Sequence, residues 1–411
     1  MNYTTFEEAL KQADLPLEGD ALSVYRAFEQ VTDGRHKRGV RYSVALILTL
    51  IVLAKLAGMT TPRAIAEWVR LRAGRLRKVL PVTRKNFPCA ATYSNVLQTL
   101  DAEQVNEVVT QLLTRVGAMK RCGDEPSRLV GQAECAAHMH VALDGKTLRG
   151  TLGHEAADQR KMHQLALYET GTGLVLKEQV VGEKENELSI VSQFLMPVWV
   201  KGRIISADAL HTQHTFCGDV THGGGYFLLV AKGNQPTLRD DLQLFFSEPP
   251  ADCQDWRTAR SVDKGHGRLE LREVVASTEL NEFLADKWTG VAQVFRLVRT
   301  VTKKGQTSEE VVYGLTALSP GQASAQDLLA LVRDHWAIEN RLHYRRDVTL
   351  REDDCQVRKG EAPRVLAVLN SFLLALLDFL GVSNVPSQMR TFDAHPLQAV
   401  RLLLGSLLTF K

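Results

Sequence analysis

The chain has 411 residues, of which 24% are charged and 45% are hydrophobic, with 50 basic and 47 acidic side chains. This composition is typical of globular proteins and excludes a disordered, collagen-like or disulfide-scaffold protein. At roughly 100–200 residues per domain, the length predicts two or three domains. The six cysteines lie far apart without a CxxC pair, which favours free thiols in a reducing cytoplasm over a zinc ribbon.

The apolar segments are too short or too interrupted for a membrane span. The run over 44–54 is broken by Thr49 and ends before Lys55, short of the roughly 20 residues that a bilayer requires. The Leu-rich segment 365–382 contains Asn370, Ser371 and Asp378, so it predicts a core helix. The first residues lack the basic and apolar regions of a signal peptide. We therefore expect a cytoplasmic protein with no membrane partner.

Positive charge is concentrated near the N-terminus. Residues 1–34 carry seven acids against two bases, whereas residues 35–85 carry thirteen bases and one acid, Glu67. Such a cluster favours a nucleic-acid surface, because counterions released on binding offset its self-repulsion. The alternative is a solvated helix face that pairs with the acidic first 34 residues. The candidate DNA contacts in the densest stretch are Arg70, Arg72, Arg75, Arg77 and Lys78.

Residues 1–122 are predicted to be mostly helical. The segment 42–57 is too continuously apolar for a surface helix, and Thr60-Thr61-Pro62 is typical of a helix start. Apolar residues keep helical spacing over 92–116, with a break expected near Asp101. These short helices fit either a helix-turn-helix-like module or a plain helical bundle. The polar segment 123–138 is interpreted as a linker.

The pattern then changes to short apolar runs bounded by glycine or polar residues, which is typical of strands. Such runs occupy 141–150, 163–170, 174–181, 202–210 and 225–233, with helices predicted over 187–200 and 212–222. This order predicts a mixed α/β sheet, antiparallel at first and parallel later. Four further runs within 255–318 predict an all-β insertion. Two long helices are expected over 326–346 and 362–382.

Two aspartates lie within or at the end of predicted strands, where a carboxylate indicates a possible ligand site. Asp144 lies inside an apolar strand, where an unpaired charge is costly, and Gly145 after it leaves room for a ligand near the backbone. Asp208 follows the strand over 203–207, and ligands of open α/β sheets collect at the carboxyl ends of strands. Each aspartate alone could be a turn residue. Two on different strands of one sheet favour a site.

A third carboxylate lies on the helix predicted over 328–346. At 3.6 residues per turn, one stripe of this helix holds His335, Glu339, His343 and Arg346. The stripe could be solvated. However, the first half of the helix is largely apolar and Trp336 lies near Glu339, which favours a half-buried carboxylate that needs a cation.

Two aspartates and one glutamate, with no cysteine and no compact histidine set, suit hard cations such as Mg²⁺ or Mn²⁺. Two such ions can clamp the attacking and leaving oxygens of a phosphodiester displacement, with cations around the phosphate. The basic side chains near the motifs are Lys146, Arg149, Lys184, Lys232 and Arg346. A zinc site on His211, His214 and the His335/His343 face is the alternative, because zinc favours such His pairs.

Six ordered segments resemble DDE transposases of bacterial insertion sequences, in the branch that contains the H-repeat-associated proteins. They are ALDGKTLRGT around Asp144, KENEL at 184–188, SADALHTQ around Asp208, AKGNQPTL at 231–238, KGHGRLELR at 264–272 and HWAIENRLHYRRDVTLREDD at 335–354. In addition, DGRHKRGVRYSVALILTL and GMTTPRAIAEW resemble the helical domain that precedes the catalytic domain in that branch. The resemblance covers roughly residues 30–380.

The resemblance implies an α/β fold with a ribonuclease H-like catalytic domain, a β-rich insertion and a preceding helical N-terminal domain. The expected domains are a basic DNA-binding domain over 1–122, a catalytic domain over 138–240 and 322–390, and an insertion over 241–321. Asp144 and Asp208 match the two catalytic aspartates and Glu339 matches the catalytic glutamate. These three residues would hold two Mg²⁺ or Mn²⁺ ions per active site.

The chain departs from the wider family in one motif. Broader relatives carry Tyr, Arg, Glu and Lys at spacing Y-x2-R-x3-E-x6-K. The Tyr, Arg and Lys positions here hold Val332, His335 and Arg346. Arginine keeps a phosphate-binding charge, whereas the roles of the other two cannot be transferred. One of the acids that follow could be a ligand instead of Glu339: Asp347, Glu352, Asp353 or Asp354.

The function implied by the resemblance is DNA transposition. Such an enzyme binds transposon-end DNA, cuts a strand by metal-dependent hydrolysis, and joins the freed 3′-hydroxyl to target DNA by transesterification. Its partners are double-stranded DNA and a second copy of the chain, in the nucleoid region of a bacterial cytoplasm. The alternative is a transposase-derived DNA-binding protein without cleavage activity. Further candidate DNA contacts are Asn234, Gln235, His266, Arg268, Arg272, His335 and His343.

Overall fold

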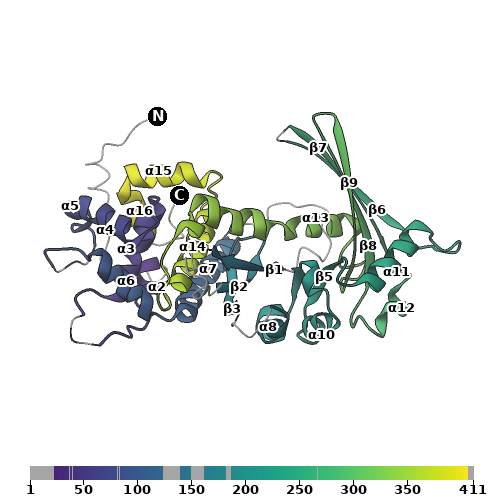
Figure 1. Ribbon diagram of the computed structural model, residues 1–411, viewed down its shortest axis with the longest axis horizontal. Coiled ribbons are helices and arrows are strands. Elements are labelled where there is room, and N and C mark those ends of the chain that lie inside the picture. Colours follow the sequence, from purple (N-terminus) through teal and green to yellow (C-terminus); the bar gives the residue numbers. More distant parts are fainter. Residues whose placement is uncertain are drawn as a thin grey trace, which may run out of the picture.

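The computed structural model describes residues 23–36, 38, 40–80, 82, 84–123, 139–149, 162–181, 187–265 and 267–405, with side chains described up to residue 115 in the segment 84–123. Within these ranges, the strands form one sheet in the order β3-β2-β1-β4-β5-β9-β8-β7-β6. Helices from both ends of the chain gather beyond the β3 edge, and β6–β9 form the opposite end of the molecule (Figure 1). The mixed α/β class predicted from the sequence is confirmed.

The helical part combines the two ends of the described chain. Its N-terminal members are α2 (Val24–Phe28), α3 (Val44–Leu56), α4 (Pro62–Leu71), α5 (Ala73–Leu76), α6 (Ala90–Thr99) and α7 (Ala102–Gly123). Its C-terminal members are α14 (Ala362–Phe379), α15 (Val385–Ala394) and α16 (Pro396–Leu404). Helices α15 and α16 pack on α3, and α14 packs on α3, α6 and α7. Part of the segment 322–390, expected in the catalytic domain, therefore packs with the N-terminal helices.

Local sequence signals explain how these helices begin and end. Every residue of α3 is buried, as its continuous apolar run predicts, and Ser43 caps its first turn. Helix α4 begins with Pro62, and the Thr61 side chain accepts a hydrogen bond from the Ala64 N–H, which confirms the predicted start. The break expected near Asp101 separates α6 from α7.

The strands near the helical part follow the predicted directions. They are β1 (Met139–Leu148), β2 (Met162–Glu169), β3 (Val175–Val181), β4 (Arg203–Ala207) and β5 (Tyr226–Ala231). Strands β1, β2 and β3 pair antiparallel, whereas β1, β4 and β5 pair parallel. The connections contain α8 (Glu187–Phe194), α9 (Pro197–Val200), the short helix η4 (Ala209–His211) and α10 (His214–His222).

The predicted β-rich insertion continues the same sheet. It contains β6 (Arg257–Gly265), β7 (Arg268–Ser277), β8 (Gln293–Lys303) and β9 (Gln306–Thr316), with α11 (Pro236–Ser247) before them and α12 (Asn281–Ala285) between β7 and β8. Strand β9 pairs antiparallel with β5 and so joins the insertion to the central strands. The outer ends of these strands project from the body of the molecule as an arm (Figure 1).

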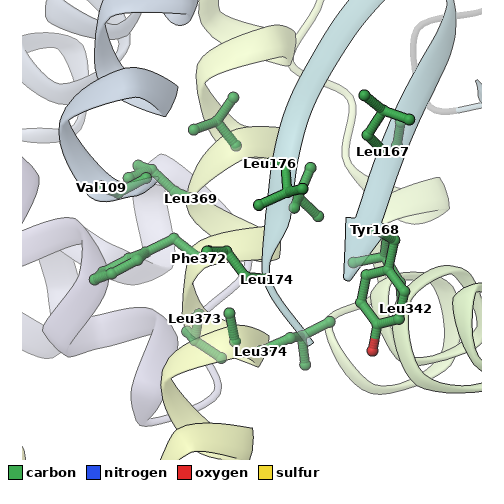
Figure 2. Packing of buried hydrophobic residues seen from close by; sticks show 14 of the residues in the cluster. Val109, Leu167, Tyr168, Leu174, Leu176, Leu342, Leu369, Phe372, Leu373 and Leu374 are labelled. Atoms are coloured by element: carbon green, nitrogen blue, oxygen red, sulfur yellow. The ribbon is translucent and has the colours of Figure 1, made fainter. Parts of the chain in front are cut away.

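Helix α14 joins the helical part to the sheet. In Figure 2, Leu369 and Phe372 of α14 lie near Val109 of α7, near Leu176 of β3 and near Leu174, which directly precedes β3. These side chains are all buried. By length and composition α14 could cross a bilayer, but 83% of it is buried inside the fold. It is thus a core helix, as the interrupted Leu-rich pattern predicted.

The long helix expected over 326–346 changes type along its length. Helix α13 (Ala325–His335) begins at a capping box of Ser324 and Asp327 and is α-helical. It is followed by two π-helical segments, η5 (Ile338–His343) and η6 (Arg345–Thr349), and by the short η7 (Glu352–Asp354). A π-helical turn is wider and changes the angular step per residue. The predicted stripe is therefore wrong at its end, where Arg346 turns into the interior.

Candidate active site

Asp144 lies on β1, and Asp208 directly follows the parallel neighbouring strand β4. Leu143 of β1 pairs with Ala207 of β4, so Asp144, which lies inside β1, is beside Asp208, which directly follows β4. The Asp144 side chain is 26% exposed and its Oδ1 accepts a hydrogen bond of 2.8 Å from the Gly145 N–H. The Asp208 side chain is 50% exposed. Sheet register thus brings together two carboxylates that are distant in the sequence.

Glu339 joins them from η5. One ligand atom each from Asp144, Glu339 and His343 lie within 4.8 Å of one another. Asp144, Asp208 and Glu339 all line one open cleft of about 1000 Å³. The structure therefore gathers all three predicted carboxylates at one cleft, with Asp208 outside the tightest group.

His343 lies between two of the carboxylates. Its Nδ1 is 3.4 Å from Asp144 Oδ2 and 3.3 Å from Glu339 Oε2, and its side chain is 5% exposed. Burial lowers the pKa of His343, but the hydrogen bonds to Asp144 and Glu339 outweigh it and the net pKa is raised. The hydrogen bond from His343 lowers the pKa of Glu339. The expectation that His343 contacts DNA is corrected, because the imidazole is enclosed by the acids.

A chain of neutral polar groups lies beside the acids. His335 Nδ1 is 2.9 Å from Ser206 Oγ, which is 2.7 Å from His140 Nε2. Burial lowers the pKa of His140 to about 3. Burial also lowers the pKa of His335, although Asp144 and Asp208 oppose the shift. His335 lines the cleft, and its lowered pKa disfavours a positive charge on its side chain.

A second network supports the loop that carries Asp208. The Glu187 carboxylate, at the start of α8, is hydrogen-bonded by His163 and, at 3.1 Å, by His211 Nε2. These bonds lower the pKa of Glu187 to about 2. His163 Nδ1 is 3.0 Å from Thr147 Oγ1, and His211 Nε2 is 3.9 Å from Asp208 Oδ1. Sequence reasoning did not assign this role, although Glu187 lies in the KENEL segment.

Gly145 of β1 lies next to the Glu187 and His163 side chains of this network. A Cβ atom there would lie 2.6 Å from both Glu187 Oε1 and His163 Nε2. The room that was expected for a ligand is thus filled by these two side chains.

We expect Gly145→Ala to lower the free energy of unfolding by about 1–3 kcal/mol, because the added methyl group overpacks this site. Urea denaturation should show little change in the control Gly171→Ala, where nothing lies within 4 Å of the added Cβ. Equal stability of the two variants would contradict this packing.

The predicted N-terminal DNA contacts lie at the helical end of the molecule, opposite β6–β9 (Figure 1). Four of them are exposed: Arg70, Arg75, Arg77 and Lys78. The fifth, Arg72, is half-buried, with its guanidinium 2.7 Å from Asp393 and over the ring of Trp68. The structure thus leaves most of this basic surface open to a partner.

A second basic surface lines the cleft itself. Lys232, Arg268 and Arg272 are among the lining residues, as are Arg299 and Arg333, which sequence reasoning missed. Buried Glu270 holds Arg268, Arg272 and Arg299 through ion pairs. Arg299 lies directly opposite Arg272 because β7 and β8 pair in that register. A local sequence pattern does not encode the register between strands, so Arg299 could not be assigned to the cleft from the sequence.

Two basic residues predicted to contact DNA are corrected. Lys146 is 8% exposed and its Nζ lies 2.5 Å from Asp347 Oδ1. Arg346 is fully buried, 2.6 Å from Glu178 and 2.8 Å from Glu352. Their charges are neutralised inside the protein, because a buried cation needs such partners.

The remaining predicted contacts differ in their surroundings. Arg149 is 76% exposed, with Nε 3.9 Å from Asp353. Asn234 donates a hydrogen bond to the carbonyl of Ala209, and Gln235 donates one of 3.0 Å to the carbonyl of Thr212. These two amides thus hold the loop after Asp208. Lys184 and His266 lie outside the described residues.

The alternative metal sites are not assembled in the described part of the chain. His214 Nδ1 lies 2.8 Å from the carbonyl of Lys287, whereas His211 contacts Glu187. The zinc set of histidines is therefore dispersed. Of the acids behind Glu339, Asp347 contacts Lys146 and Glu352 contacts Arg346, whereas Glu339 lies with Asp144.

The sheet and its converging carboxylates define a mixed α/β protein with a cleft that holds three carboxylates beside basic side chains. Comparison with protein families gives two matches: the transposase DDE domain over residues 136–377, and the DDE_Tnp_1-associated domain over residues 25–113. The first match covers more than half of the chain. The chain therefore belongs to the transposase DDE domain family, and the resemblance noted in the sequence is confirmed.

Similar proteins occur in bacteria. A protein of Xanthobacter autotrophicus, encoded in the dhlA 3′ region, is 30% identical over 288 residues, which cover 69% of this chain and 90% of that protein. The H repeat-associated protein YhhI of Escherichia coli K12 is 29% identical over 245 residues, 58% of this chain and 63% of YhhI. Among solved structures, a piggyBac transposase synaptic complex with hairpin DNA aligns over 91% of this chain and 76% of that chain, with 10% identity and a TM-score of 0.38.

Proposed function

We propose that the protein is a transposase that binds transposon-end DNA and performs metal-dependent strand cleavage and strand transfer. The observation that carries this proposal is the convergence of Asp144, Asp208 and Glu339 on one cleft from three separate elements. Membership of the transposase DDE domain family supports it. The proposal includes a ribonuclease H-like catalytic domain, with the β6–β9 arm as its insertion.

The donor set at the cleft fits divalent cations. The oxygens of Asp144 and Glu339 are hard ligands of the kind that Mg²⁺ and Mn²⁺ prefer, and they approach within the spacing of groups that share an ion. Asp208, at the adjacent strand end, would serve a second ion together with Asp144. Two bound ions would supply stabilisation of negative charge on the attacking and leaving oxygens of a phosphodiester.

The protein's own charges would hold the DNA. Lys232 and Arg268 line the cleft and would contact phosphate oxygens beside the acids, whereas the paired Arg272 would add to the positive potential. The exposed arginines of α4 and α5 form a separate surface at the other end of the molecule and would contact DNA outside the cleft. We further propose that the protein acts as a homodimer on DNA, in the bacterial cytoplasm, because two transposon ends must be handled together.

A nicking experiment tests the proposal. A supercoiled plasmid that carries the coding region with its flanking DNA is incubated with the full chain in Mg²⁺, in Mn²⁺, or in EDTA. We expect nicked and linear products only with a divalent ion, whereas mobility-shift assays should show DNA binding under all three conditions. Binding should weaken steeply as salt rises, because phosphate contacts release counterions. DNA binding without cleavage in either metal would instead support a transposase-derived DNA-binding protein.

A further inference from the structure

His343 is placed where a ligand to the proposed ion would be. It follows Glu339 by one turn of η5, and its Nδ1 lies at nearly equal distances from Asp144 Oδ2 and Glu339 Oε2, 3.4 and 3.3 Å. Its side chain is only 5% exposed, so bulk water cannot replace these contacts. Among the described residues, its other ring nitrogen, Nε2, has no hydrogen-bond partner. The imidazole ring therefore points its Nδ1 atom at the two carboxylates.

The two hydrogen-bonding distances of His343 Nδ1 also suit an ion shared with the carboxylates. A charge-assisted N–H···O bond is about 2.7–2.9 Å long, so both contacts of His343 are long for such bonds. Adjacent ligands of an octahedral ion with bonds of about 2.1 Å lie about 3.0 Å apart, and those of a tetrahedral ion slightly farther. The separations of His343 Nδ1 from the two carboxylate oxygens are thus already close to those that one ion would impose.

We propose that His343 Nδ1 is a direct ligand of a divalent ion held by Asp144 and Glu339. The inference rests on the proposed metal-dependent function, to which it adds a nitrogen donor in an otherwise all-oxygen site. Imidazole favours transition metals, whereas Mg²⁺ prefers oxygen ligands. The wild-type protein should therefore bind Mn²⁺ more tightly than Mg²⁺ at this site, and most of that preference should depend on His343.

Electron spin-echo envelope modulation of Mn²⁺ bound to the full chain tests this directly and needs no DNA. The wild type should show modulation from a coordinated ¹⁴N nucleus, and His343→Gln should bind Mn²⁺ without it. The matched control is His335→Gln, because His335 lies one turn before Glu339, lines the same cleft and is hydrogen-bonded to Ser206 instead. This control should keep the modulation. Titration calorimetry should show about tenfold weaker Mn²⁺ binding to His343→Gln, with a smaller change for Mg²⁺.

A second measurement covers the case in which His343→Gln does not fold. Wild-type protein labelled with ¹⁵N only at histidine should lose the ¹⁴N modulation, because the coordinating nitrogen has changed its nuclear spin. Mn²⁺ bound without any nitrogen coupling would overturn the role of His343 and leave the proposed transposase function intact. No Mn²⁺ binding at all, in a protein that also fails to nick DNA, would overturn both. Modulation that persists in a folded His343→Gln variant would also refute the assignment.

Discussion

Replacing Asp144 with Asn should abolish strand cleavage while DNA binding persists. The amide oxygen can still accept the 2.8 Å hydrogen bond from the Gly145 N–H, so β1 should keep its geometry. The loss of one carboxylate charge from the metal donor set should lower the nicking rate at least about a thousandfold, which corresponds to about 4 kcal/mol of transition-state stabilisation. Plasmid nicking in Mg²⁺ measures the rate, and a mobility shift on the same DNA measures binding.

The matched control for this variant is Asp240→Asn. Asp240 lies on α11 and is 62% exposed, so the same chemical change there should leave nicking unaltered. If the three carboxylates act as one unit, Asp208→Asn and Glu339→Gln should be as inactive as Asp144→Asn, and a double variant should be no worse than either single one. Nicking by Asp144→Asn at the wild-type rate would place the reaction elsewhere.

The order of the helices and strands could be predicted because the spacing of apolar residues differs between the two kinds of element. The strands that were predicted from apolar runs are present, and the start of α4 at Pro62 follows from its cap. Asp144 and Asp208 could be assigned for a related reason. A carboxylate inside or at the end of an apolar strand stands out against the apolar residues around it, and parallel pairing of the strands then brings the two carboxylates together.

Features that depend on long-range partners could not be predicted in this way. The sequence shows that Lys146 and Arg346 are cations, but not that Asp347 and Glu178 bury and neutralise them. Likewise, a 3.6-residue period assumes a regular α-helix, whereas π-helical turns after His335 move Arg346 off the stripe that holds Glu339. The packing of α15 and α16 on α3 is also a contact between the two ends of the chain, and a local pattern does not predict such a contact.

The largest effect on stability should come from Arg346→Met. The Arg346 guanidinium has no exposed surface and pairs with Glu178 at 2.6 Å and with Glu352 at 2.8 Å. Asn370 of α14 donates to Glu352 and accepts from Lys55 of α3, so the network reaches the helical part. Methionine fills a similar volume without charge and leaves both carboxylates buried without their cation. Breaking a buried pair in this way costs about 3–5 kcal/mol.

Urea denaturation measures this loss, with Arg70→Met as the matched control. Arg70 is 71% exposed and its pair with Glu67 spans 3.9 Å, so its loss should change the unfolding free energy by less than about 0.5 kcal/mol. The triple variant Arg346→Met, Glu178→Gln and Glu352→Gln should recover part of the lost stability, because it removes the unpaired buried charges as well. If Arg346→Met unfolds at the same urea concentration as Arg70→Met, water must reach Glu178 and Glu352, and the buried pairs of Arg346 would not stabilise the fold.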